Sequence, residues 1–123
     1  GDARACALLL PLLPDGGCAK SAAEALGRLG CSEAEEPLFR LLLAGGGLAY
    51  QVVEPLGLLR SQRAVPELKR MLHDTQPWVR QVVVRALGRI GGEGVRSCLK
   101  KAAGDPDPEV RAEAGRWLAG GET

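Results

Sequence analysis

The sequence has few aromatic residues, one histidine and almost no net charge, and each shortage argues against a class of protein. Aromatic residues make up 3% of the 123-residue chain, and the formal net charge is +1. A nearly neutral chain lacks the overall positive field that attracts nucleic acids or anionic membranes. Any electrostatic preference for a partner must therefore come from local clusters of charge.

Long apolar runs are also missing. No stretch of about twenty apolar residues occurs, so the sequence predicts no membrane-spanning helix. The apolar run 7–13 is short, is interrupted by Pro11 and lacks the basic lead of a signal peptide. The length suits one continuous core, so we expect a single domain over 1–123. Because the chain starts at Gly1 without a methionine, we expect it to be a fragment of a longer protein.

The four cysteines do not have the spacing of metal ligands, since no two form a CxxC pair and no histidine cluster accompanies them. They are Cys6, Cys18, Cys31 and Cys98. Their number allows a disulfide framework, but cysteines in helical, half-apolar segments are usually small core residues. We therefore expect buried free thiols, no bound metal or cofactor, and a reducing, cytoplasmic location.

Internal repetition is the strongest positive signal in the sequence. The segments ALGRLG (25–30), PLGLLR (55–60) and ALGRIG (86–91) resemble one another, and WLAGG (117–121) is a weaker fourth copy. They recur at intervals of about 30 residues, within the range of helical repeat arrays. Each copy has a leucine in the same slot: Leu26, Leu56, Leu87 and Leu118.

A second type of helix recurs at the same interval, with predicted copies at 34–42, 64–72 and 95–103. Their shared apolar slot holds Leu38, Leu68 and Leu99, and Leu8 occupies it about 30 residues earlier. Alanine-rich and leucine-rich sequence favours helix throughout. We therefore predict an all-α fold, a right-handed α-solenoid of about four helix pairs: a leading half repeat, three full pairs and a trailing helix. The predicted units are 1–15, 16–44, 45–73, 74–104 and 105–120.

Smaller signals predict helix ends and helix contacts. Asp107 can cap a helix whose first residue is Pro108. Glycine recurs inside the first helix of each pair, at Gly27, Gly57 and Gly88, where it costs about 1 kcal/mol relative to alanine. The repetition of that cost predicts close contact between neighbouring helices.

These repeats resemble HEAT repeats, in particular the short form of about 30 residues first associated with bilin lyases. The shared motif is D-x-x-P-x-V-R, then A-L-G-x-[IL]-G, then a second helix with A-V-P-x-L, and it covers essentially the whole chain. The resemblance implies an α-solenoid, but the family includes scaffolds, transport factors, lyase subunits and nucleic-acid binders. In the family the aspartate of the turn commonly pairs with the following arginine, which implies the pairs Asp74–Arg80 and Asp105–Arg111.

We do not expect an enzyme. HEAT-like enzymes of the deoxyhypusine hydroxylase type hold a di-iron centre through His-Glu pairs directly after the V-R of the first helix. The corresponding pairs contain no histidine, and only Glu113 matches: Lys20–Ser21, Tyr50–Gln51, Gln81–Val82 and Ala112–Glu113. His73 beside Asp74 has the residue types of a general base and its orienting carboxylate. A helix-terminal imidazole near the C-terminal dipole is the simpler interpretation, because no nucleophile is evident beside it.

Second-type helices normally line the inner, concave face of such a stack, where ligands usually lie. The residues expected on that face are Leu9, Leu10, Phe39, Arg40, Lys69, Arg70, Lys100 and Lys101. The face would change from apolar at its N-terminal end to basic at its C-terminal end. We therefore predict a non-catalytic scaffold or adaptor that binds a partner peptide or helix with a hydrophobic anchor followed by acidic residues. The alternative is an ordinary solvated basic face.

The alternative function is a HEAT-like module that binds the backbone of nucleic acid. The same basic residues, with Arg96, would contact phosphates, and HEAT-like DNA glycosylases show that the fold can hold duplex DNA. Against this, Glu67 and Glu93 interleave with the basic residues, and aromatic residues are scarce. We therefore expect a protein partner, with nucleic acid as the less favoured one.

The two tryptophans are further candidates for contact with a partner. Trp78 follows Pro77 in the turn between repeats, so we expect it to be partly exposed, either as a partner anchor or packed on a neighbouring turn. The first and last helices each lack a pairing helix, which suggests end-to-end association of copies. We assign such an interface to Trp117 and Glu113; the alternative is that Trp117 folds back as a cap on its own chain.

Overall fold

The computed structural model describes residues 3–13 and 19–120, and within these residues the regular structure is entirely helical. The α-helices are α1 (Ala3–Leu9), α2 (Ala19–Leu29), α3 (Glu35–Ala44), α4 (Gly47–Leu58), α5 (Val65–Met71), α6 (Pro77–Ile90), α7 (Glu93–Ala102) and α8 (Pro108–Leu118). Short 3-10 helices are η1 (Leu10–Leu12), η2 (Ser32–Ala34) and η3 (Gln62–Ala64). The predicted all-α fold is confirmed. In the described part of the chain, no helix has both the length and the apolar character needed to cross a membrane.

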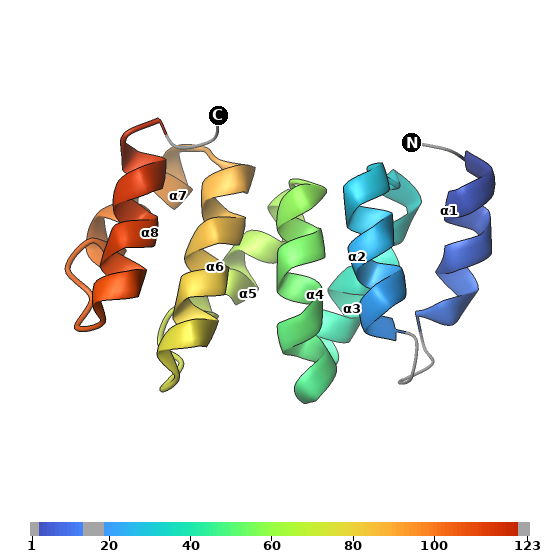
Figure 1. Ribbon diagram of the computed structural model, residues 1–123, viewed down its shortest axis with the longest axis horizontal. Coiled ribbons are helices and arrows are strands. Elements are labelled where there is room, and N and C mark those ends of the chain that lie inside the picture. Colours follow the sequence, from blue (N-terminus) through green and yellow to red (C-terminus); the bar gives the residue numbers. More distant parts are fainter. Residues whose placement is uncertain (1–2, 14–18, 121–123) are drawn as a thin grey trace.

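The helices stack in two rows (Figure 1). In the front row α2, α4, α6 and α8 lie side by side, and each packs against the next. Behind this row lie α3, α5 and α7, while α1 packs against α2 at the N-terminal end. Three helix pairs are therefore preceded by one helix and followed by one helix, as predicted for an α-solenoid with half repeats at both ends.

The repeated leucines form the centre of one continuous core. The leucines at the repeated positions of both helix types are buried: Leu26, Leu56, Leu87, Leu38, Leu68 and Leu99. Leu118 of the last unit is only half-buried, because no further helix follows α8 among the described residues. Each unit thus buries its apolar face against its neighbours, as expected of a solenoid.

Glycine lets the helices of the front row approach one another closely, which confirms the prediction. A Cβ atom added to Gly27 would lie 2.9 Å from the Cα of Pro55, and one added to Gly57 would lie 2.7 Å from the Cα of Ala86. Where α6 packs against α8, the ring of Trp117 lies directly on Gly88. Real Cβ atoms essentially never make contacts shorter than 3.0 Å, so a side chain at these positions would push the helices apart.

The start of α8 has the predicted cap. The carboxylate of Asp107 accepts hydrogen bonds from the backbone N–H groups of Glu109 and Val110, at 2.9 and 3.2 Å. These bonds satisfy backbone donors that have no partner inside the helix. Pro108 is the first helical residue, where its missing N–H costs nothing.

The first helix departs from the predicted register. The repeat places Leu8 in the core, but its side chain is 70% exposed, and Cys6 is the buried residue of α1. The prediction is wrong because two residues along a helix of 3.6 residues per turn point about 200° apart, so burial of Cys6 turns Leu8 outward. Leu9 and Leu10, expected on the solvent side, are half-buried and pack against the core.

Two cysteines form a disulfide, so the prediction of free thiols is wrong for them. Cys6 of α1 is bonded to Cys31, in the turn after α2, with their Cα atoms 5.9 Å apart. The packing of α1 against α2 brings together two residues that are separated by 25 positions in the sequence. Cys98 is a free thiol, as predicted, but it is half-buried and not fully buried, and Cys18 lies outside the described residues.

Candidate functional site

A cleft of about 600 Å³ lies between α5 and α7, on the side of the second-type helices. We call it the α5–α7 cleft. Its lining combines the basic side chains of Lys69 and Lys101 with the apolar Leu72 and Ala102 and the thiol of Cys98. Its volume is in the range of sites that take a small ligand or the anchoring side chains of a peptide.

The α5–α7 cleft has unneutralised positive charge. Lys69 and Lys101 are exposed, and neither forms an ion pair with any residue that the structure describes. Asp105 also lines the cleft, but its carboxylate is bound by Arg80. The exposed His73 stands at the same cleft. A carboxylate of a partner would therefore find two free ammonium groups there.

The other basic residues of the predicted face do not line this cleft. Lys100 is exposed and lies next to Lys101 in α7. Arg70 is exposed and pairs with Glu67 at 3.5 Å within α5. Surface pairs of this kind contribute less than about 1 kcal/mol, so Arg70 remains accessible to solvent and to a partner.

The apolar end of the predicted face is partly covered by the chain itself. The guanidinium of Arg63 lies over the ring of Phe39, 4.7 Å from its centroid, and also pairs with Glu36. Arg40 pairs with the same Glu36 at 3.1 Å. Arg63 therefore covers part of the apolar surface that Phe39 was expected to offer, while Leu43 of α3 is 56% exposed. The role of these residues as partner contacts stays a prediction.

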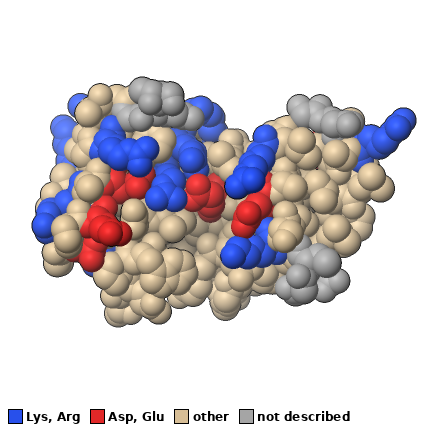
Figure 2. Space-filling model, viewed as in Figure 1, with Lys and Arg blue, Asp and Glu red and all other residues tan. Residues whose placement is uncertain are grey.

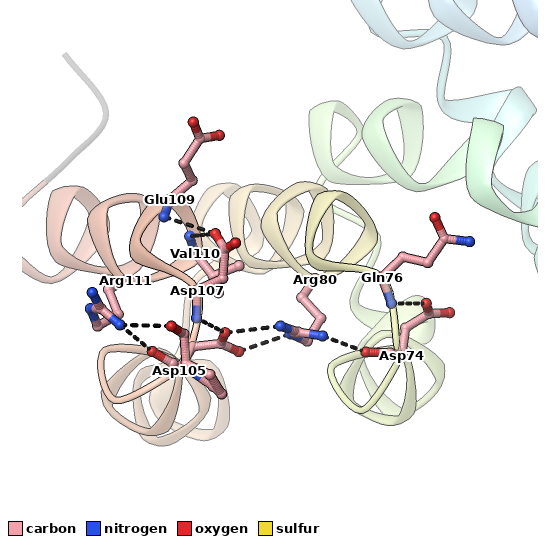
Figure 3. Close-up of polar contacts among 9 residues, drawn as sticks. Asp74, Gln76, Arg80, Asp105, Asp107, Glu109, Val110 and Arg111 are labelled. Atoms are coloured by element: carbon pink, nitrogen blue, oxygen red, sulfur yellow. Dashed lines mark hydrogen bonds and ion pairs between the residues drawn. The ribbon is translucent and has the colours of Figure 1, made fainter.

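The turns before α6 and α8 are joined by an ion pair that runs between repeats (Figure 3). Arg80 donates its Nε and Nη2 to the carboxylate of Asp105, at 2.9 and 3.1 Å, and its Nη1 to the backbone carbonyl of Asp74 at 2.7 Å. Arg111 donates to the backbone carbonyls of Asp105 and Pro106. The family resemblance implied that the carboxylate of Asp105 pairs with Arg111 of the same turn. This is wrong, because the carboxylate binds Arg80 of the preceding repeat and Arg111 binds backbone carbonyls.

The orientation of Asp105 explains this arrangement. Its Oδ1 accepts the backbone N–H of Asp107 at 2.9 Å, which holds the carboxylate toward the preceding repeat and its arginine. Burial by itself raises the pKa of Asp105, but the bonds from Arg80 and from the N–H of Asp107 outweigh it, and the pKa lies below the ordinary 3.8. The ion pair thus fixes one turn to the next.

A network of charged side chains crosses the front row. Glu54 of α4 accepts from Arg85 at 3.5 Å and from Arg89 at 2.6 Å, so these ion pairs join adjacent repeats. Arg85 also binds both carboxylate oxygens of Glu113, at 3.3 Å each, and the indole N–H of Trp117 donates to Glu113 at 2.9 Å. Glu113 is 3% exposed and Trp117 is half-buried. Both residues have partners within the chain, and their role in end-to-end association stays a prediction.

Replacing Glu113 by glutamine is expected to lower the free energy of unfolding by about 1 kcal/mol at neutral pH, because a charged acceptor of two arginine bonds is lost. Burial raises the pKa of Glu113, but the bonds from Arg85 and Trp117 outweigh it and the pKa lies below the ordinary 4.5. The stabilisation by a carboxylate with a lowered pKa is present above its unfolded pKa and is lost as the pH falls through the folded one. Urea unfolding of both proteins from about pH 7 to about pH 3 should therefore show the difference shrink on acidification.

Glu24→Gln is the matched control for this prediction, since Glu24 has no ion pair with a described residue and should change stability by less than about 0.5 kcal/mol. A difference between Glu113→Gln and the native chain that stays constant across the pH range would show that the charge of Glu113 does not contribute.

Trp78 lies at the start of α6 in the front row and is 51% exposed. Its ring packs against Tyr50 of α4 in an edge-to-face contact, with the centroids 5.8 Å apart, and its indole N–H donates to Gln76 at 2.7 Å. The expected partial exposure is confirmed, and it coexists with packing on a neighbouring helix. Tyr50, itself 37% exposed, is a candidate contact residue that the repeat pattern does not single out. Its spacing from Trp78, close to one repeat length, is the only signal of it in the sequence.

Comparison with known proteins agrees with this architecture. Residues 47–119 match HEAT repeats, and residues 19–43 match the PBS lyase HEAT-like repeat. The chain is 40% identical over 65 residues, 51% of its length, to deoxyhypusine hydroxylase of Danio rerio and, to the same extent, of Mus musculus. It is 37% identical over 81 residues, 58% of its length, to serine/threonine-protein kinase 36 of Pongo abelii.

These similarities span small parts of the relatives. The matched region covers 21% and 22% of the two hydroxylases and 6% of the kinase. What is shared is therefore repeat structure, which many different functions use. HEAT repeats match over half of this chain, and its helices stack in the corresponding pairs. The chain belongs to the HEAT-repeat family.

Proposed function

We propose that this protein is a non-catalytic interaction scaffold that binds an acidic segment of a partner protein in the α5–α7 cleft. HEAT repeats are generally scaffolds for protein interaction, which supports the class of function. The observation that carries the specific proposal is that Lys69 and Lys101 line one cleft, from two consecutive second-type helices, without any ion pair to a described residue. Two free ammonium groups beside an apolar wall suit a peptide with acidic residues next to an apolar one.

The apolar residue of the partner is expected to bind inside the α5–α7 cleft and not at the N-terminal end of the predicted concave face. Leu72 and Ala102 line the cleft itself, whereas Phe39 is covered by Arg63. The proposed segment is therefore short, with its apolar residue and its acidic residues close together. It does not need to extend along the full row of second-type helices.

The absence of catalysis is part of the proposal. His73 is the sole histidine, and the four positions that carry His-Glu pairs in the hydroxylase type of HEAT-like enzyme contain none here. The similarity to deoxyhypusine hydroxylase concerns about a fifth of that enzyme, so it supports common repeats and not a common reaction. The cytoplasmic location also stays a prediction, and the disulfide of Cys6 removes part of its basis, which was free thiols.

The test is binding of a fluorescein-labelled peptide with a leucine followed by a run of glutamates, measured by fluorescence anisotropy. Lys69→Glu combined with Lys101→Glu is expected to weaken binding at least about tenfold, because both changes replace attraction by repulsion. Lys101→Glu alone should also weaken binding, and Lys100→Glu is its matched control, because it makes the same charge change one residue away, outside the cleft. Lys100→Glu should weaken binding less than about twofold.

Equal losses for Lys100→Glu and Lys101→Glu would show a diffuse basic surface and not a cleft. Failure of the native chain to bind the peptide would contradict the proposal. Duplex DNA provides the comparison with the nucleic-acid alternative. Tighter binding of the duplex than of the peptide, with a steep dependence on salt, would favour that alternative.

A further inference from the structure

A second groove lies on the opposite side of the molecule, along the front row of helices. It has a volume of about 540 Å³ and runs over α4, with α2 on one side and α6 on the other. Pro55, Leu58 and Val82 line its apolar part. Figure 2 shows this side of the molecule, where charged side chains gather across the middle and upper part. A broad uncharged area covers the lower part, where α4 and α6 begin.

One end of the groove has an exposed aromatic pair. Tyr50 and Trp78 both line the groove and contact each other edge to face. They are 37% and 51% exposed, so both rings present surface to the solvent. Exposed tryptophan and tyrosine beside an apolar wall are the residues most often found at the centre of binding surfaces.

The wall formed by α2 has a row of three charges. Lys20, Glu24 and Arg28 are four residues apart, so they lie one above another along a single face of the helix. None of the three forms an ion pair with a described residue. The row of alternating sign is therefore available to a partner.

The opposite wall adds little free charge. Glu54 lines the groove, but it is paired with Arg85 and with Arg89, which also lines the groove. Glu54 thus binds both arginines, and the charges left for a partner are those of α2. The groove thus offers a basic, an acidic and a basic site in that order, beside an apolar floor.

We propose that this groove docks an amphipathic α-helix of a partner protein that has an acidic, a basic and an acidic residue at positions i, i+4 and i+8. A helix lying along α2 has the same rise per residue, so its charges meet those of α2 at every turn over about 12 Å. An extended segment covers about twice that distance with the same number of residues and would lose the match. The apolar stripe of the helix lies on the groove floor, and a large side chain at one end contacts Trp78 and Tyr50.

This surface is separate from the α5–α7 cleft, and no residue lines both. The protein would then hold one partner segment on each side of its stack. An adaptor with two such surfaces brings two partners together without any change in its own structure.

The test uses two synthetic helical peptides of about 15 residues, a length at which an isolated helix is marginally stable. The first has Glu, Lys and Glu at i, i+4 and i+8, with leucines and one phenylalanine on the opposite stripe. The second has Lys, Glu and Lys at the same positions. The full chain should bind the first peptide at least about tenfold more tightly than the second, as measured by fluorescence anisotropy.

Three variants decide whether the groove is the site. Lys20→Glu, Glu24→Lys and Arg28→Glu, combined in one chain, should reverse the preference between the peptides, and a reversal is not produced by loss of folding. Trp78→Ser should weaken binding at least about tenfold. Lys69→Glu combined with Lys101→Glu changes only the α5–α7 cleft and should leave the affinities for both helical peptides unchanged. Failure of the proposed helix-binding groove is therefore distinguishable from failure of the proposed acidic-peptide site.

Equal affinity for the two peptides, in the native chain or in the charge-reversed variant, would overturn the proposal. The same holds if neither peptide binds or if Trp78→Ser has no effect. Binding of a single-stranded oligonucleotide that depends on Trp78, in place of the peptides, would assign the groove to nucleic acid and would also overturn it.

Discussion

Replacing Cys6 by serine is expected to lower the free energy of unfolding by about 3 kcal/mol, because it removes a cross-link that closes a loop of 25 residues. Cys6 is also the buried residue of α1, so the disulfide carries much of the attachment of this helix to the stack. Leu8, with 70% of its surface exposed, contributes little to that attachment. Urea unfolding of the native chain and of Cys6→Ser, with and without a thiol reductant, measures the effect.

The control for this prediction is Cys98→Ser, since Cys98 is a free, half-buried thiol. It should change stability by less than about 1 kcal/mol and should keep the sensitivity to reductant. Hydrogen exchange provides a second readout, because amides of α1 should exchange faster in Cys6→Ser while those of α6 change less. Identical unfolding of the native chain with and without reductant would show that the disulfide does not hold α1.

Replacing Gly57 by alanine is expected to destabilise the protein by about 2–3 kcal/mol, although alanine is the better helix former by about 1 kcal/mol. The added Cβ would lie 2.7 Å from the Cα of Ala86 and 2.8 Å from its Cβ. Neither atom is the end of a flexible side chain, so α4 and α6 must move apart and loosen the core between them. Thermal or urea unfolding measures the loss.

Gly115→Ala is the matched control. Gly115 lies inside α8, and a Cβ atom added to it would meet nothing within 4 Å. The same substitution should there stabilise the protein by about 1 kcal/mol, because only the difference in helix propensity remains. If both substitutions stabilise, the front-row helices are not in the close contact described here.

The repeat pattern predicted most of the fold because it reports on interactions that are local or that recur. Leucine slots spaced by one repeat are buried in both types of helix, and Asp107 caps α8 as expected. The contact positions of Gly27, Gly57 and Gly88 were also predictable, since a recurring glycine inside a helix needs a recurring cause. Capping, helix propensity and periodicity depend on neighbours in the sequence, and the sequence displays these directly.

The candidate sites were predicted less well, because they depend on the directions of single side chains. The pattern grouped Lys69 and Lys101 on one face, and they do line one cleft, but it did not reveal that Arg63 covers Phe39. It named Trp78 but not Tyr50, which packs against it from the neighbouring helix. Such contacts join residues from different repeats, at offsets that differ from the repeat length by a few positions.

The sequence by itself determined that this chain is a helical solenoid and, outside the first helix, which leucines its helices bury, since these properties follow from short-range patterns of apolar, capping and glycine residues. Only the tertiary structure decided the disulfide of Cys6 with Cys31, the ion pair of Arg80 with the aspartate of the following repeat, the α5–α7 cleft and the groove over α4. The physical reason is that stacking fixes the rotation and distance of each helix relative to the next. A shift of two residues along a helix, as between Cys6 and Leu8, turns a side chain from the core to the solvent without altering the repeat.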